Sequence, residues 1–363
     1  MTADSGASDR LTAGDPLEQY DYGSHWVSEQ ISRGALGIQH PLLVSVLKFG
    51  LVWNLLAAAY LAVADTTFSP GYLVASGLGL LWVNIAPYLI WYYDERVLPS
   101  FFERLGEILP EEASVDELAE KYTTMFAEPQ PLVAAFWTVG TVAIVFAGTD
   151  VLRAQGMVGT GSVFIWTTYA YALFIGLVLS HGFMGPVLTL RLIGEVAEAD
   201  LQIDPLHPDN LGGLSTVGYC AIRTTLLYST ASLFLPLLFR FSAASASGIV
   251  IFAFATVYVC TILGTFLYPT LRVSLRAHTL RDTALERIRR EYRQVEAEMQ
   301  TPDRDELSEL NRRLELQRLQ TKYQNFNSVS LYPLQTSILA RLAGSVFLPL
   351  LFIFVEFYVP KLI

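Results

Sequence analysis

The chain contains repeated blocks of about 20 apolar residues with few charges inside them, the length that crosses roughly 30 Å of hydrocarbon. Lipid offers no partner for backbone N–H and C=O groups, so each block must close its hydrogen bonds internally as an α-helix. A soluble chain of 363 residues could form two domains, but it would not gather its apolar residues in this way. The pattern therefore predicts an all-α membrane protein.

Seven blocks are long enough to be spans. They lie at residues 41–64, 71–93, 131–149, 162–190, 214–238, 248–270 and 336–359. We therefore expect a bundle of about seven transmembrane helices, with a transmembrane region over 41–271 and one last span near the C-terminus. The polar, acidic residues 1–40 predict a partly disordered N-terminal segment.

The positions of lysine and arginine orient these spans. If the N-terminus is cytoplasmic, the loops after the second, fourth and sixth spans are also cytoplasmic, and they hold most of the basic residues. The opposite loops hold few. Cytoplasmic loops carry such an excess in membrane proteins. The sequence thus predicts a multi-pass protein of the cell membrane with a cytoplasmic N-terminus and an outside C-terminus.

A soluble helical element is predicted over residues 272–327. Its first apolar series, which alternates steps of three and four, is Leu285, Ile288, Tyr292, Val295 and Met299. That spacing is typical of a coiled-coil seam. A Thr-Pro-Asp interruption at 301–303 precedes a second apolar series that ends near Phe326. We expect an antiparallel cytoplasmic hairpin of two helices, with one long bent helix as the alternative.

The composition restricts the partners of the chain. Acidic residues outnumber basic ones by 34 to 24, which argues against nucleic-acid binding, because that function needs a basic face. The surplus of acid and the scarcity of lysine are similar to the composition of halophilic proteins. The expected partner is the lipid bilayer, and the 272–327 hairpin could also join copies of the chain or bind a cytoplasmic protein.

The most distinctive string, Asp204-Pro-Leu-His-Pro-Asp-Asn-Leu-Gly-Gly-Leu214, lies between the fourth and fifth predicted spans. Its prolines and its pair Gly212 and Gly213 are typical of turns, and the glycines permit positive φ. We interpret it as a structured turn whose Asp204, His207 and Asp209 cap neighbouring helices. The alternative is a metal or ligand site at His207 and Asp209, although one histidine with loosely spaced acids is a weak ligand set.

This string resembles a His-Pro-Asp-x-x-Gly-Gly-Leu pattern that occurs in uncharacterised multi-pass membrane proteins of prokaryotes, haloarchaea among them. Two further shared features are a charged helical segment before the final span and the Leu-Tyr-Pro-Leu string at 331–334, where tyrosine replaces an expected tryptophan. The resemblance covers roughly residues 180–355. It implies a membrane location and a shared architecture, and it implies no activity.

Ionisable residues inside spans are functional candidates by default. Four basic ones fall in the cytoplasmic third of their predicted spans: Lys48, His181, Arg223 and Arg341. They could line a cytoplasm-facing cavity that attracts anions, or they could extend toward the headgroups. Asn54 and Asn84, in the first two spans, predict hydrogen bonds between helices rather than ligands.

These features favour a transporter or channel-like protein with a cytoplasm-facing basic cavity. A membrane-anchored sensor or scaffold that acts through the 272–327 hairpin is the alternative. An enzyme that uses His207 and Asp209 at the membrane face ranks third, because no catalytic motif accompanies them. The sequence identifies no cofactor, substrate or ion.

Overall fold

The computed structural model describes residues 26–64, 68–106, 108–109, 112–127, 129–198, 204–207, 209, 212–243, 248–299 and 306–328. These residues are mostly helical and contain no strand. Among them, six helical stretches are long and apolar enough to cross a membrane. The predicted seventh span, 336–359, and the candidate Arg341 lie outside the described residues.

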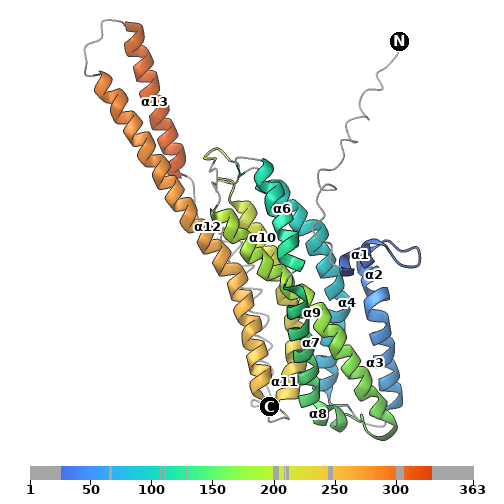
Figure 1. Ribbon diagram of the computed structural model, residues 1–363. Helices are drawn as coiled ribbons and strands as arrows, with labels where there is room; N and C mark the ends of the chain where they lie inside the picture. Colours follow the sequence, from blue (N-terminus) through green and yellow to red (C-terminus); the bar gives the residue numbers. More distant parts are fainter. Residues whose placement is uncertain are drawn as a thin grey trace, which may run out of the picture.

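The helices form an elongated bundle from which one long helix projects (Figure 1). In chain order they are α1 (Trp26–Ser32), α2 (Pro41–Ser45), α3 (Leu51–Val63), α4 (Pro70–Tyr92), α5 (Leu98–Leu105), α6 (Glu112–Ala127), α7 (Gln130–Ala147), α8 (Thr149–Ala154), α9 (Val163–Glu198), α10 (Ser215–Ser229), α11 (Leu235–Ala243), α12 (Gly248–Met299) and α13 (Glu306–Ser328).

The six stretches coincide with the first six predicted spans. They are Pro41–Val63, Pro70–Leu105, Gln130–Ala147, Gly159–Glu198, Ser215–Phe241 and Thr256–Glu298. The multi-pass α-helical architecture is therefore confirmed in coarse form. The second, fourth and sixth stretches continue beyond their predicted ends, because amphipathic sequence follows each apolar block without a helix break.

Continuation of the second span builds part of the core. A π-helical turn, Tyr93–Val97, joins α4 to α5. Leu98, Phe101, Phe102 and Leu105 of α5 are all buried, in one apolar cluster with side chains of α6, α9 and α10. Their spacing at i, i+3, i+4 and i+7 places all four on one face of the helix.

Polar contacts join the helices at defined points. The side-chain amides of Asn54 and Asn84 exchange two hydrogen bonds of 2.9 and 3.1 Å, which confirms their predicted role between helices. Gly50 lies against this pair, since a Cβ there would approach Asn84 Oδ1 to 1.9 Å. Lys121 of α6 lies 2.8 Å from Glu195 of α9, and this hydrogen bond raises the pKa of the Lys121 ammonium.

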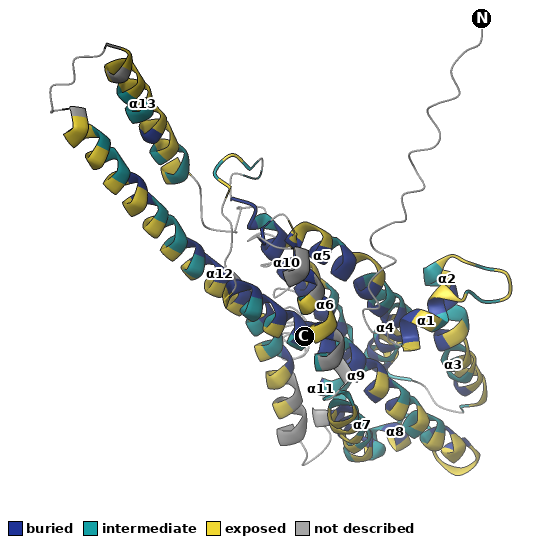
Figure 2. Cartoon of the chain, turned by 45° about the horizontal axis from the view of Figure 1, so that its top comes forward, coloured by how far each residue is buried: buried dark blue, intermediate teal, exposed yellow. Residues whose placement is uncertain are grey.

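Helix α12 runs from the bundle into solvent without a break, so no boundary occurs at residue 272, where the sequence analysis placed one. Helix α13 lies alongside its far end (Figure 1). Arg289 of α12 donates a 2.6 Å hydrogen bond to the Tyr323 hydroxyl of α13. Leu285, Ile288 and Leu319 are buried, while most other residues of this pair are exposed (Figure 2).

Candidate functional site

An acidic side chain lies inside the bundle at the π-helical turn Tyr93–Val97. Asp94 is only 7% exposed. A π-helical turn inserts one extra residue into the helical repeat, and such turns are frequent at functional sites. Here the turn directs Tyr93, Asp94 and Val97 to the interior together. A carboxylate in this position is costly unless polar groups surround it.

A histidine lies inside the same bundle on α9. His181 is 4% exposed, and its Nδ1 lies 2.8 Å from the backbone oxygen of Leu177. A carbonyl oxygen only accepts, so Nδ1 carries the proton of the neutral ring. Nε2 then accepts from the side-chain amide of Gln130, 3.3 Å away. The imidazole is therefore held in one tautomer, with Nε2 as the atom that can take a second proton.

Asp94 and His181 line one pocket of about 60 Å³ between α4, α9 and α10. Tyr93, Thr224 and Thr230 add hydroxyls to its lining. We call this space the polar pocket after these groups, although apolar side chains form most of its wall. The Tyr93 hydroxyl lies 2.5 Å from that of Thr189. Two titratable side chains thus line one pocket inside the bundle, and such groups are candidates for proton binding.

The short helix α1 covers both titratable groups. Ser28 donates a hydrogen bond to the Asp94 carboxylate, and the Trp26 ring meets the His181 ring edge-on at a centroid distance of 5.9 Å. Val27 and Ile31 anchor α1 in the core with 0% and 1% exposure. Helix α1 was not expected from the sequence, because its seven residues lie in a polar segment.

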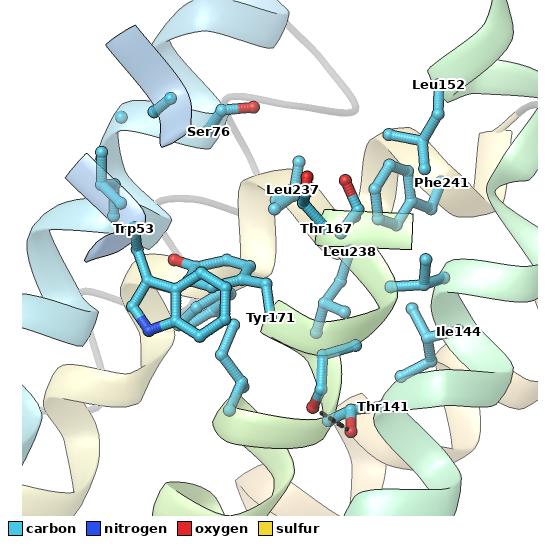
Figure 3. A pocket seen from close by; sticks show the side chains of 18 of the residues that line it. Trp53, Ser76, Thr141, Ile144, Leu152, Thr167, Tyr171, Leu237, Leu238 and Phe241 are labelled. Atoms are coloured by element: carbon cyan, nitrogen blue, oxygen red, sulfur yellow. Dashed lines mark hydrogen bonds between the residues drawn. The ribbon is translucent and has the colours of Figure 1, made fainter. Parts of the chain in front are cut away.

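A second and larger cavity lies toward the α8 end of the bundle. Its volume is about 320 Å³, and its walls come from α3, α4, α7, α9 and α11 together with Tyr258 of α12 (Figure 3). Aromatic side chains, among them Trp53 and Tyr171, form much of the surface. We call it the apolar cavity. It shares Leu179 and Ala231 with the lining of the polar pocket, so the two spaces adjoin.

The three predicted basic residues that the structure describes do not line one cavity together. Lys48 is exposed and donates a 2.6 Å hydrogen bond to the backbone oxygen of Gln30, so it caps the last turn of α1. Arg223 is exposed and lines a crevice of about 20 Å³ with Arg104. His181 alone of the three lines the polar pocket.

The loop that contains His207 is a set of local hydrogen bonds. Asp204 Oδ1 accepts from Leu206 N at 2.9 Å. The Asp209 carboxylate accepts from Gly213 N and Ser215 N, both at 3.2 Å, at the start of α10. His207 Nδ1 lies 2.7 Å from Asp209 Oδ1. These contacts favour the structured turn over a ligand site.

The glycine pair has the backbone that the sequence suggested. Gly212 and Gly213 have φ of 68° and 90°. A Cβ at Gly213 would approach Ile108 Cγ2 to 2.6 Å, so the loop packs closely against the core. Within the described residues, no three His, Cys, Asp or Glu side chains form a set that could hold a metal.

The residues that sequence reasoning missed are Asp94, Ser28 and Tyr93. Asp94 follows Trp-Tyr-Tyr and precedes Glu-Arg, which is the usual appearance of a span end. A usable signal was the helical spacing of Leu98, Phe101, Phe102 and Leu105, which continues the helix past Asp94. A search of protein-family models, curated proteins and solved structures finds no match to the chain.

Proposed function

We propose that this multi-pass membrane protein is a transporter that moves protons, alone or with a substrate, through the polar pocket. The observation that carries the proposal is the burial of Asp94 and His181 in one pocket inside helices that can cross a membrane. Ionisable groups are costly in hydrocarbon, and chains of Asp, Glu and His form proton relays in pumps and transporters.

The geometry supports a role for each group. His181 Nε2 can accept a proton while Nδ1 keeps its bond to Leu177. Asp94 can be protonated in place, with Ser28 rotating its hydroxyl to suit either state. This proposal replaces the basic, anion-attracting cavity of the sequence analysis, because Lys48 and Arg223 lie on the surface.

Proton entry into vesicles tests the proposal. The full chain is reconstituted with a trapped pH-sensitive dye, and the rate of internal acidification is measured after an external acid step. We expect wild type to exceed protein-free vesicles and Asp94→Asn to fall to their level. Asp150→Asn is the matched control, since that side chain is 84% exposed. Wild-type rates equal to protein-free rates, or an active Asp94→Asn, would contradict the proposal.

A histidine pair adds a second comparison. His181→Gln should slow acidification, because glutamine keeps a polar side chain but cannot take up the second proton. His40→Gln is its control, since His40 is exposed before α2 and its side chain makes no cap hydrogen bond. Equal slowing in both variants would point to a general loss of fold rather than to proton transfer.

The second candidate function is a membrane-anchored scaffold that joins two copies through α13. It is favoured by Leu310 and Leu314, which are 56% and 54% exposed on α13. If α13 pairs with its copy, a cysteine at Leu310 should crosslink between chains, and Leu314→Ser should abolish the crosslink. Absence of any crosslink in membranes would remove this candidate.

A further inference from the structure

We infer that the apolar cavity is a binding site for the hydrocarbon chain of a bilayer lipid. At about 320 Å³ it is roughly twice the volume of apolar cavities that stay dry and bind benzene. It also falls in the size range of ligand pockets, which are mostly apolar. An occupant of this space would gain the dispersion contacts that its lining atoms lack when it is empty.

The walls of the apolar cavity suit a chain rather than a polar solute. Several hydroxyls in the lining are already bonded to the protein backbone. Thr141 donates to Ala172 O at 2.8 Å, and Thr167 and Thr168 donate to Phe164 O at 2.9 and 2.8 Å. These hydroxyl protons are therefore not available to a solute, and the aromatic and aliphatic carbons between them offer dispersion contacts.

The wall also contains the hydroxyl of Tyr171. The Tyr171 hydroxyl is buried and has no hydrogen-bond partner within the described part of the chain. A buried donor without a partner calls for an explanation. Its oxygen has almost no accessible surface, so an ester or hydroxyl oxygen of a lipid can accept from it only after the ring shifts. The chain would lie along the neighbouring Trp53 ring, whose centroid is 5.0 Å from that of Tyr171 (Figure 3).

The apolar cavity opens to the side of the bundle. Leu61 of α3 and Leu73 of α4 line it and are also 50% and 40% exposed, and Gly77 of α4, also in the lining, is exposed as well. The mouth therefore faces the medium around the apolar belt of α3 and α4, which is lipid. From Trp53 to Leu61 the lining on α3 extends about 12 Å, comparable with one ~15 Å leaflet of hydrocarbon.

Glycines provide a matched test. A Cβ at Gly77 would meet no heavy atom within 4 Å, and the same holds at Gly264 of α12, which does not line the cavity. Gly77→Trp should fill the apolar cavity and Gly264→Trp should leave it open. Ala57→Leu is a second filling variant, since Ala57 lies in the lining.

The probe is phosphatidylcholine that carries a photoreactive diazirine in its acyl chain, in vesicles that contain the full chain. After illumination, modified residues are mapped by mass spectrometry. We expect adducts at Trp53 and Tyr171 in wild type and Gly264→Trp, and a roughly ten-fold decrease in Gly77→Trp and Ala57→Leu. Labelling at Val74 and Val139, which face outward and are 62% and 68% exposed, should not change.

Unchanged adducts at Trp53 and Tyr171 in both filling variants would overturn the inference. So would wild-type labelling confined to outward residues such as Val74. The result does not depend on proton movement, because Asp94→Asn should keep full cavity labelling even where it abolishes acidification of vesicles.

Discussion

Ser28 of α1 donates a hydrogen bond to the carboxylate of Asp94, which lies 66 residues further along the chain. The bond fastens a short helix from the polar N-terminal segment over an acidic group inside the bundle. With Trp26 against His181, it places α1 over both titratable side chains of the polar pocket.

Ser28→Ala should loosen α1. Loss of a hydrogen bond to a charged acceptor costs roughly 1.5–3 kcal/mol, so amide hydrogen exchange across residues 26–32 should accelerate. Glu29→Ala is the control on the same helix, because its carboxylate pairs with Arg33 on the exposed surface, and such a pair contributes only about 0.3–0.5 kcal/mol. Equal exchange in both variants would mean that the bond to Asp94 does not hold α1.

Two substitutions in the turn before α10 should lower the stability of the protein by different amounts. Asp209→Ala removes the acceptor of two backbone N–H groups and should cost about 1 kcal/mol. Gly213→Ala should cost more, because a Cβ there has both a positive φ and a close contact with Ile108. The measurement is the thermal unfolding midpoint in detergent.

Gly159→Ala separates the two causes at Gly213. Gly159 also has positive φ, at 58°, but its Cβ would meet nothing within 4 Å. Gly159→Ala should therefore lower the free energy of unfolding only through the strain of a positive φ, by roughly 1–2 kcal/mol. If Gly213→Ala unfolds no earlier than Gly159→Ala, the packing against Ile108 contributes nothing.

A charged residue in the apolar seam between α12 and α13 should separate the two helices. Ile288 is 3% exposed, and Ile288→Asp places an unpaired charge there, which costs several kcal/mol, on the order of 3. Hydrogen exchange across 306–328 should then approach the rate of an unfolded chain. Arg287→Asp, at an exposed neighbouring position, should leave these rates unchanged. If residues 306–328 keep their protection from hydrogen exchange in Ile288→Asp, the apolar seam does not hold α13 against α12.

Thiol labelling from one side of the membrane tests the predicted orientation. Thr321→Cys on α13 and Val158→Cys after α8 are exposed positions at opposite ends of the bundle. In a background without Cys220 and Cys260, an impermeant thiol reagent should modify only Val158→Cys in sealed cells. Modification of Thr321→Cys before permeabilisation would reverse the proposed topology.

Features that depend on local sequence were predicted well. The apolar blocks predicted six spans that coincide with the described helices, because a 20-residue apolar block admits only one backbone structure in lipid. The His207 loop also followed from its own residues, since Asp side chains and a glycine pair form turns without help from distant segments.

Features that depend on which way a side chain points were not predictable. Charge placement gave Lys48, His181 and Arg223 a common depth, but depth does not tell which face of a helix meets its neighbours. Lys48 and Arg223 turned out to be on the surface. Asp94 was assigned to a loop, because its burial requires both the π-helical turn and the cover of α1.

The most direct test of the proposed proton path asks whether Asp94 takes up and releases a proton inside the bundle. Infrared difference spectra of the reconstituted protein are recorded as the pH is lowered, in H2O and in D2O. Because the other carboxyls of the chain also protonate as the pH falls, the band of Asp94 is the difference between the spectra of wild type and Asp94→Asn. We expect this difference to contain a protonated-carboxyl band that grows on acidification, shifts in D2O and is unchanged when Asp150→Asn replaces wild type. Spectra of wild type and Asp94→Asn that are identical at every pH would contradict the proposed proton path.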